Sequence, residues 1–165
     1  MKSRVGLGFD VHPFGNAPPL VLGGVRIEES PRLAGHSDGD AVAHAVADAL
    51  LSPLGLPDLG TMYPASDEQH RGAESMEWLR EIAQQVVKLG WWIDNVDVVV
   101  AAETPKLASH VGAMAANLSE VLHKAREPMG RGIGVAVKPK HAEGLGAIGR
   151  SEGIAVWAVA LLSRG

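Results

Sequence analysis

Two residues near the start of the chain are the first that could do chemistry together, Asp10 and His12 in the run GLGFDVHPF. On a β-strand, a spacing of two places both side chains on one face and turns Val11 to the other. A carboxylate and an imidazole on one face supply half of a metal site. Such a pair also arises by chance on exposed strands, so this motif alone leaves both interpretations open.

A second polar group lies in the run AGHSDGDAVAHAVADALL, residues 34–51. Asp40, His44 and Asp48 recur every four residues and would form one stripe on a helix whose opposite face is apolar. This stripe has two interpretations. It is either a solvated helix face, or His44 is a third metal ligand and Asp40 or Asp48 orients an imidazole through a hydrogen bond in the second coordination shell. Two histidines, one carboxylate and an open fourth position are typical of catalytic zinc, whereas structural zinc has four protein ligands.

A third group lies near the C-terminus. Lys138, Lys140, His141 and Glu143 combine cationic groups with one carboxylate, which suits a phosphate and its Mg²⁺ or, equally, a solvated loop end. The next run, GLGAIG, matches G-x-G-x-x-G, but a dinucleotide site needs a further helix, a strand and an acidic residue about 20 positions on. Only 16 residues follow Gly149. We therefore expect a tight turn whose N–H groups could meet a phosphate, and no dinucleotide site.

The composition limits the available functions. With 165 residues, of which 46% are hydrophobic, the chain can form one domain with an aliphatic core. It has no cysteine, so any metal must be bound by His, Asp or Glu. A net charge of −4 without a basic run gives no support for binding nucleic acid or an anionic membrane. No targeting segment or membrane-spanning run is evident, so we expect a cytoplasmic protein.

The hydrophobic pattern predicts the elements that must position these groups. The predicted strands cover residues 4–12, 20–28, 96–102 and 132–138, and the predicted helices cover 40–51, 76–87 and 107–123. Residues 151–163 fit a buried helix or a buried strand equally well. No repeat or linker interrupts the chain. We expect one domain over residues 1–165, of the α+β or α/β class, with a mixed sheet packed on one side by helices.

Three local features refine this prediction. The pair Gly23 and Gly24 should form a bulge or a bend within the second strand. Ser37 or Asp38 should be the N-cap of the first helix. Residues 52–72 should form a long loop, which a compact domain rarely leaves without structure unless the loop has a use.

Taken in order, the motifs resemble those of the 2-C-methyl-D-erythritol 2,4-cyclodiphosphate synthase family, enzymes of the non-mevalonate isoprenoid pathway. The resemblance covers nearly all 165 residues and rests on GFDVHPF, LVLGGVRI, GHSDGD, DALL, LPDLG, NVDVVV, TPKL and GRSEGIAVWAVALL. It implies a homotrimer with active sites between neighbouring subunits. It further implies conversion of 4-diphosphocytidyl-2-C-methyl-D-erythritol 2-phosphate to the cyclic diphosphate, as the 2-phosphate attacks the β-phosphorus and displaces CMP.

The resemblance also implies roles for individual residues. Asp10, His12 and His44 would hold Zn²⁺ or another divalent transition metal, and Glu143 would hold Mg²⁺ or Mn²⁺ against the diphosphate. The implied catalytic set contains His36, His141 and Glu143. The implied substrate contacts are Ser37 at the attacking phosphate, Asp58 and Gly60 at the erythritol or ribose hydroxyls, Ala102, Pro105, Lys106, Leu107 and Ala108 at the cytidine, and in addition Lys140 and Arg150.

Three positions depart from the family pattern. His141 stands where the family has a phosphate-contacting threonine, Ala65 replaces an aspartate near the substrate, and Ala147 replaces a large aromatic residue facing the trimer axis. The axial charged pair, Arg150 and Glu152, is present. These departures motivate the alternative of a divergent zinc-dependent trimer that acts on, or merely binds, another cytidine nucleotide or an isoprenoid diphosphate.

Overall fold

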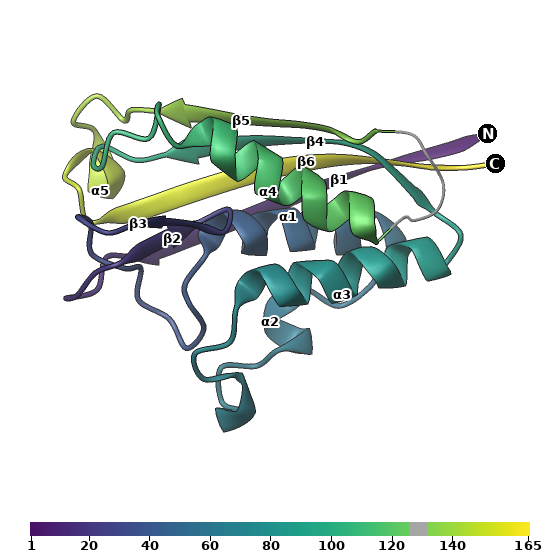
Figure 1. Cartoon of the computed structure of the whole chain (residues 1–165), viewed down its shortest axis with the longest axis horizontal. Helices are drawn as coiled ribbons and strands as arrows, with labels where there is room; N and C mark the ends of the chain where they lie inside the picture. Colours follow the sequence, from purple (N-terminus) through teal and green to yellow (C-terminus); the bar gives the residue numbers. More distant parts are fainter. Residues whose placement is uncertain (126–131) are drawn as a thin grey trace.

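The computed structural model describes residues 1–125 and 132–165, and a four-stranded sheet is its frame (Figure 1). The strands, in spatial order, are β1 (Lys2–Pro13), β6 (Gly153–Arg164), β4 (Trp92–Ala101) and β5 (Gly134–Lys140). β6 pairs antiparallel with both β1 and β4, whereas β5 runs parallel to β4. The predicted mixed sheet is therefore confirmed, and the apolar tail is a strand.

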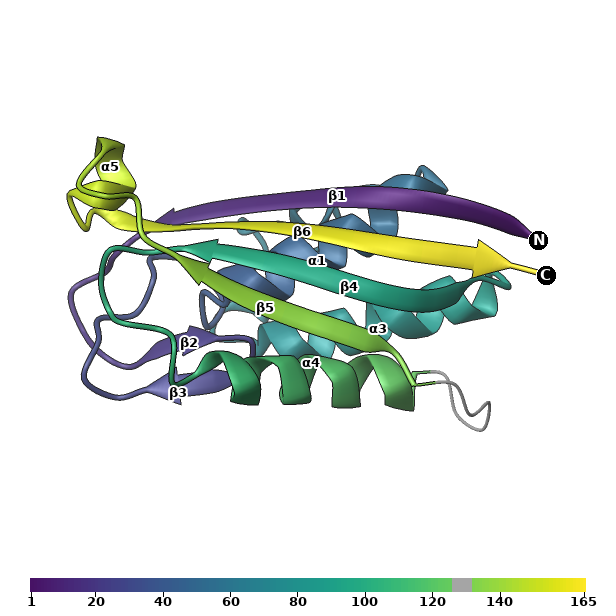
Figure 2. The ribbon, with the colours of Figure 1, turned by 90° about the horizontal axis from the view of Figure 1, so that it is seen from above.

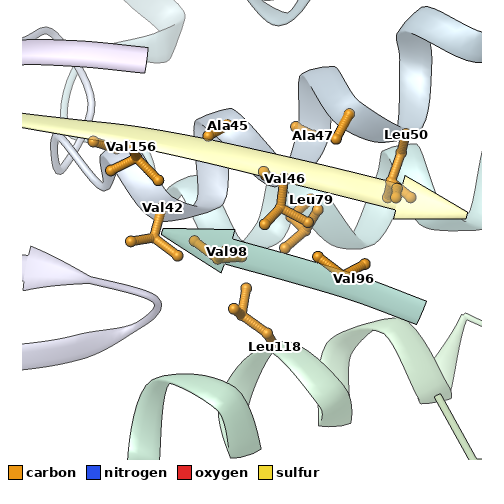
Figure 3. Close-up of a cluster of buried hydrophobic side chains, with 14 of the residues drawn as sticks. Val42, Ala45, Val46, Ala47, Leu50, Leu79, Val96, Val98, Leu118 and Val156 are labelled. Carbon is orange, nitrogen blue, oxygen red and sulfur yellow. The ribbon is translucent and has the colours of Figure 1, made fainter. Parts of the chain in front are cut away.

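Three helices cover one face of the sheet, namely α1 (Ala41–Leu51), α3 (Ser75–Lys88) and α4 (Val111–Lys124) (Figure 1). Because only one face is covered, alternate residues of β4, such as Val96 and Val98, are buried against the helices. The aliphatic core between the two layers includes Val42, Val46, Leu50, Leu79, Val98, Leu118 and Val156 (Figure 3). Helices on one side of the sheet are as predicted.

Close packing of α1 on β1 depends on glycine. The first inward-facing positions in the middle of β1 are Gly6 and Gly8. A Cβ atom at Gly8 would lie 1.9 Å from the carbonyl oxygen of Ala45, and Gly6 is equally crowded by the same helix. Only glycine therefore allows the helix to lie directly on the strand. The next inward positions of β1 are Asp10 and His12, so this close approach also brings α1 over them.

The predicted second strand is instead a hairpin of β2 (Leu20–Leu22) and β3 (Val25–Ile27). Gly23 and Gly24 form its two-residue turn with φ angles of +55° and +69°. Positive φ at both central residues is what a type I′ hairpin turn requires, and glycine adopts it without strain. The prediction of a bulge within one continuous strand was wrong.

The N-cap of α1 is Asp40, and the predictions of Ser37 and Asp38 were wrong. The buried Asp40 carboxylate accepts the backbone N–H groups of Val42 and Ala43 at 3.1 and 3.0 Å. It also accepts both N–H groups of the glycine turn, at 2.8 and 2.7 Å. One side chain thus caps the helix and anchors the hairpin to it.

The remaining differences concern loops and boundaries. The predicted loop 52–72 contains three short helices, η1 (Ser52–Leu54), α2 (Leu59–Met62) and η2 (Glu68–His70). The third long helix begins at Val111 rather than at residue 107, and β5 lies two residues later than predicted. The run GLGAIG contains α5 (Gly146–Gly149), a single turn leading into β6. None of the helices in the described part of the chain is both long and apolar enough to cross a membrane.

Candidate active site

The structure brings Asp10 and His12 of β1 together with His44 of α1. One ligand atom from each of the three side chains lies within 4.8 Å of the others. Oδ2 of Asp10 is 3.1 Å from Nε2 of His12 and 3.0 Å from Nδ1 of His44. The strand pair and the helix histidine, 34 residues apart in the chain, therefore meet in space.

Hydrogen bonds on the far side of each imidazole orient the two rings. Nδ1 of His12 lies 2.7 Å from the carbonyl oxygen of Ala34, which only accepts, so Nδ1 carries the hydrogen and Nε2 presents a lone pair toward Asp10. Nε2 of His44 lies 2.8 Å from Oγ of Ser75, and its Nδ1 faces Asp10. Three electron-pair donors converge on one point, and this set fits a divalent metal ion.

The pKa shifts of Asp10 and His12 are consistent with a metal-binding role for these side chains. Burial would raise the pKa of Asp10, but the hydrogen bonds and charges of His12 and His44 outweigh it and lower this pKa to about 2. The hydrogen bond with Asp10 raises the pKa of His12 above its usual 6.5, although burial opposes the shift. Because both shifts favour protonated His12 beside ionised Asp10, a proton and a metal ion would compete for the space between these two groups.

The cluster opens into a pocket of about 380 Å³, within the range of small-ligand sites. Three other predicted residues line it, namely His36, Ser37 and Gly60. Ala65, where the sequence departs from the family pattern, lies in the same wall. Ser37 is buried, whereas His36, Gly60 and Ala65 are exposed.

An aromatic wall of the pocket was missed in the sequence. Tyr63 stacks on Trp78 with ring centroids 4.7 Å apart, and His70 meets the Trp78 ring edge-on at 5.6 Å. Trp78 also stacks on His44 at 6.1 Å, so this wall supports a ligand of the cluster. Tyr63 and His70 belong to the segment predicted as a loop, and Trp78 fits the apolar face of a helix. Only the packing of the segments shows their shared role.

The prediction that Asp40 or Asp48 orients an imidazole was wrong. Asp40 is fully buried in the helix cap, so the polar stripe of α1 is not a solvated face either. Asp48 lines the pocket, but its hydrogen bond accepts the N–H of Leu59 at 2.8 Å and anchors α2. Ser75 and Ala34 hold the rings instead. A serine and a backbone carbonyl carry no sequence signal for this role.

A second group of predicted residues lies at the ends of β4 and β5 and in the loops that follow. The backbone N–H of Ala102 donates to the carbonyl of Lys140 at 3.0 Å and so joins the two loops. The side chains of Lys140, His141 and Glu143 are exposed and make no hydrogen bond or ion pair within the described residues. Pro105, Lys106, Leu107 and Ala108 lie in the loop before α4. None of these residues lines the pocket of the metal cluster.

Two further predicted residues serve local structure in the isolated chain. Asp58 is the N-cap of α2, and its carboxylate accepts the N–H of Thr61 at 2.8 Å. Hydrogen bonding from the side chain of Thr61, and then from this N–H, lowers the pKa of Asp58. Asp58 lies next to the pocket lining but is not part of it. Arg150 donates to Glu152 at 2.6 Å in an exposed ion pair at the end of α5.

Figure 2 shows the face of the sheet that no helix covers. Along β1 and β6 the side chains exposed on this face are mostly apolar. Phe9 of β1 packs against Trp157 of β6 with ring centroids 5.2 Å apart, and Leu7 pairs with Val159 two residues along. The exposed apolar side chains on these strands are Val5, Leu7, Phe9, Val11, Trp157 and Val159. Contiguous apolar surface of this kind marks an interaction site, because monomeric proteins rarely expose it.

Fold and site together define a single-domain α/β protein that carries a candidate metal centre where β1 meets α1. The model of the YgbB family matches residues 3–163, and the chain belongs to this family. The 2-C-methyl-D-erythritol 2,4-cyclodiphosphate synthase of Bordetella avium is 47% identical over 161 residues, 98% of this chain and 96% of the relative. The synthase of Acaryochloris marina is 43% identical over 160 residues, covering 97% and 96%.

Solved structures agree with the sequence comparison. The bifunctional IspDF of Campylobacter jejuni matches with a TM-score of 0.89 and 38% identity, over 99% of this chain and 43% of the larger protein. The CDP complex of Plasmodium falciparum IspF matches with a TM-score of 0.80 and 32% identity, over 98% of this chain and 96% of that one. The family resemblance inferred from the motifs is confirmed.

Proposed function

We propose that the chain converts 4-diphosphocytidyl-2-C-methyl-D-erythritol 2-phosphate to 2-C-methyl-D-erythritol 2,4-cyclodiphosphate with release of CMP. The observation that carries this proposal is the convergence of Asp10, His12 and His44 in a chain whose full-length relatives bear the name of this synthase. The alternatives, turnover or mere binding of another cytidine nucleotide or isoprenoid diphosphate, are not favoured by these relatives.

The reaction forms one P–O bond and breaks another. An oxygen of the 2-phosphate attacks the β-phosphorus, and the bond from that phosphorus to the cytidylate oxygen breaks as CMP leaves. In-line displacement at phosphorus needs positioning and charge neutralisation rather than a protein nucleophile. Asp10, His12 and His44 would hold a zinc ion, which would supply Lewis-acid polarisation of a phosphate oxygen. His36 and Ser37, beside these ligands in the pocket, bind the attacking phosphate.

The exposed loops supply the other half of the site. Glu143 would hold Mg²⁺ or Mn²⁺, which would neutralise charge on the diphosphate, and Lys140 and His141 donate to phosphate oxygens. The loop 102–108 binds cytidine largely through its backbone. The erythritol or ribose hydroxyls lie near Asp58 and Gly60. Arg150 is the remaining substrate contact.

The loops after β4 and β5 do not line the pocket of their own chain, so we infer that they act on the metal centre of a neighbouring subunit. The uncovered apolar sheet face supports assembly into a homotrimer.

The test is CMP release from the diphosphocytidyl substrate by the wild type, by EDTA-treated protein and by His44→Ala. We expect robust CMP release from the wild type and a loss of about 1,000-fold or more both in EDTA-treated protein and in His44→Ala. Adding zinc should restore the activity of the EDTA-treated wild type. His123→Ala, in the last turn of α4, is the matched control and should retain activity. No release from folded, zinc-loaded wild type would refute the proposal.

A further inference from the structure

We propose that Ser75 and Asp38 form a hydrogen-bonded relay that fixes the tautomer and orientation of His44 and thereby sets the metal affinity of the cluster. Both are positioning residues, since neither reaches the cluster itself. The inference rests on the proposed function only in requiring that Asp10, His12 and His44 bind a metal ion.

The two histidines are oriented by different kinds of partner. A backbone carbonyl, the partner of His12, can only accept a hydrogen bond and therefore determines the tautomer by itself. A serine hydroxyl, the partner of His44, can donate or accept. If Ser75 donated to Nε2 of His44, the ring hydrogen would sit on Nδ1, and Nδ1 would have no lone pair for a metal.

Asp38 decides between these two states. Oγ of Ser75 lies 2.5 Å from Oδ1 of Asp38, a carboxylate oxygen that only accepts. The single hydroxyl hydrogen therefore goes to Asp38, and the Ser75 oxygen accepts the Nε2 hydrogen of His44 at 2.8 Å. Ser37 is the weaker competitor, because its Oγ lies 3.3 Å from Ser75 and 3.5 Å from His44 Nε2.

The backbone holds the relay in place. The N–H of Ser75 donates to Oδ2 of Asp38 at 3.2 Å, and the N–H of Asp40 donates to its Oδ1 at 3.2 Å. The N–H of Asp38 in turn donates to the carbonyl of Ala73 at 3.0 Å. Ser75, the first residue of α3, is only 1% exposed. The start of α3 is thus joined to the loop before α1, and a hydrogen bond shielded from water retains its strength.

The experiment measures equilibrium Zn²⁺ affinity of the full-length protein by competition with a chromogenic chelator. We expect Ser75→Ala to bind zinc about 10- to 100-fold more weakly, Asp38→Asn to lose affinity to a smaller degree, and Ser75→Thr, which keeps the hydroxyl, to stay near the wild type. The matched control is Ser30→Ala, a buried serine that does not line the pocket, which should bind like the wild type.

Nitrogen-15 NMR of the zinc-loaded wild type gives a second readout, in which His44 should show a slowly exchanging Nε2–H that Ser75→Ala loses. A wild type that binds no zinc would refute the proposed metal site itself. Tight binding by the wild type with unchanged affinity in both Ser75→Ala and Asp38→Asn would refute the relay alone. Equal loss in Ser75→Ala and Ser30→Ala would also refute it, because general destabilisation would then explain the effect.

Discussion

The metal cluster and the loops that follow β4 and β5 contain most of the predicted site residues, yet they are built differently. Each cluster side chain comes from a packed strand or helix and has its partners within the chain. The side chains of Lys140, His141 and Glu143 are exposed and have no hydrogen-bond or ion-pair partner among the described residues. A preorganised centre binds its ion without help, whereas exposed loops need an opposing surface. We infer that one chain suffices to bind the metal but that the reaction requires two.

The largest expected effect comes from separating the subunits. Leu7→Asp places a carboxylate in the uncovered apolar face, where Leu7 is 61% exposed in the single chain. Burying that charge in an interface costs several kcal/mol, so we expect monomers and a loss of CMP release of about 1,000-fold. Zinc affinity should change by less than about threefold, since the cluster lies within one chain. Sedimentation velocity, chelator competition and CMP release measure the three quantities.

The matched control for this variant is Leu89→Asp, because Leu89 is an exposed leucine at the end of α3. It should leave assembly and activity unchanged. Active Leu7→Asp monomers would contradict the division of the site between two chains.

A smaller effect is expected in the loops. Glu143→Gln removes the negative charge that we assign to Mg²⁺ and should lower CMP release about 100-fold, with a higher Mg²⁺ requirement. Because the Glu143 side chain is exposed, the free energy of unfolding should stay within about 0.5 kcal/mol and zinc affinity should not change. Glu29→Gln, at another exposed glutamate, is the control. A parallel loss of zinc affinity would show that the two regions are not separate.

The smallest effect is the pH dependence of the metal centre. Protonated His12 cannot bind a metal, and its hydrogen bond with Asp10 raises its pKa above 6.5, so protons compete with zinc near neutrality. Zinc affinity should fall by up to about tenfold per pH unit below that pKa. Chelator competition at pH 6, 7 and 8 measures this slope. Affinity that is flat over this interval would show that His12 is not a ligand.

The same shifts determine how the stability of the metal-free protein depends on pH. The raised pKa of His12 contributes stability that is fully present below pH 6.5 and is lost as pH rises through the folded value. The Asp10 pKa, lowered from 3.8 to about 2, contributes stability that is present above pH 3.8 and lost as pH falls toward 2. In urea titrations, the contribution of His12 should therefore make the free energy of unfolding larger at pH 6 than at pH 9.

Local periodicity made the three ligands candidates, and the family resemblance assigned them to a metal ion. Two-residue spacing places Asp10 and His12 on one strand face, and the run GHSDGDAVAH places His44 near the start of a helix. The glycine pair at 23–24 was recognised as special but assigned to a bulge rather than a turn. The tail was ambiguous because both faces of β6 carry apolar side chains: one face packs against the helices, and Trp157 and Val159 lie on the uncovered face.

By itself, the sequence determined the family, the mixed sheet with helices on one side, and the placement of Asp10 and His12 on one strand face, because spacing along single elements and the order of motifs are local properties. That His44 of α1 meets this pair was decided by the tertiary structure. Only the tertiary structure decided that Ser75 and Asp38 stand behind His44, that Trp78 supports its ring, and that the loops after β4 and β5 lie outside its pocket. These contacts join segments about 30 or more residues apart, and only the packing of α1, α3 and the sheet brings such segments together.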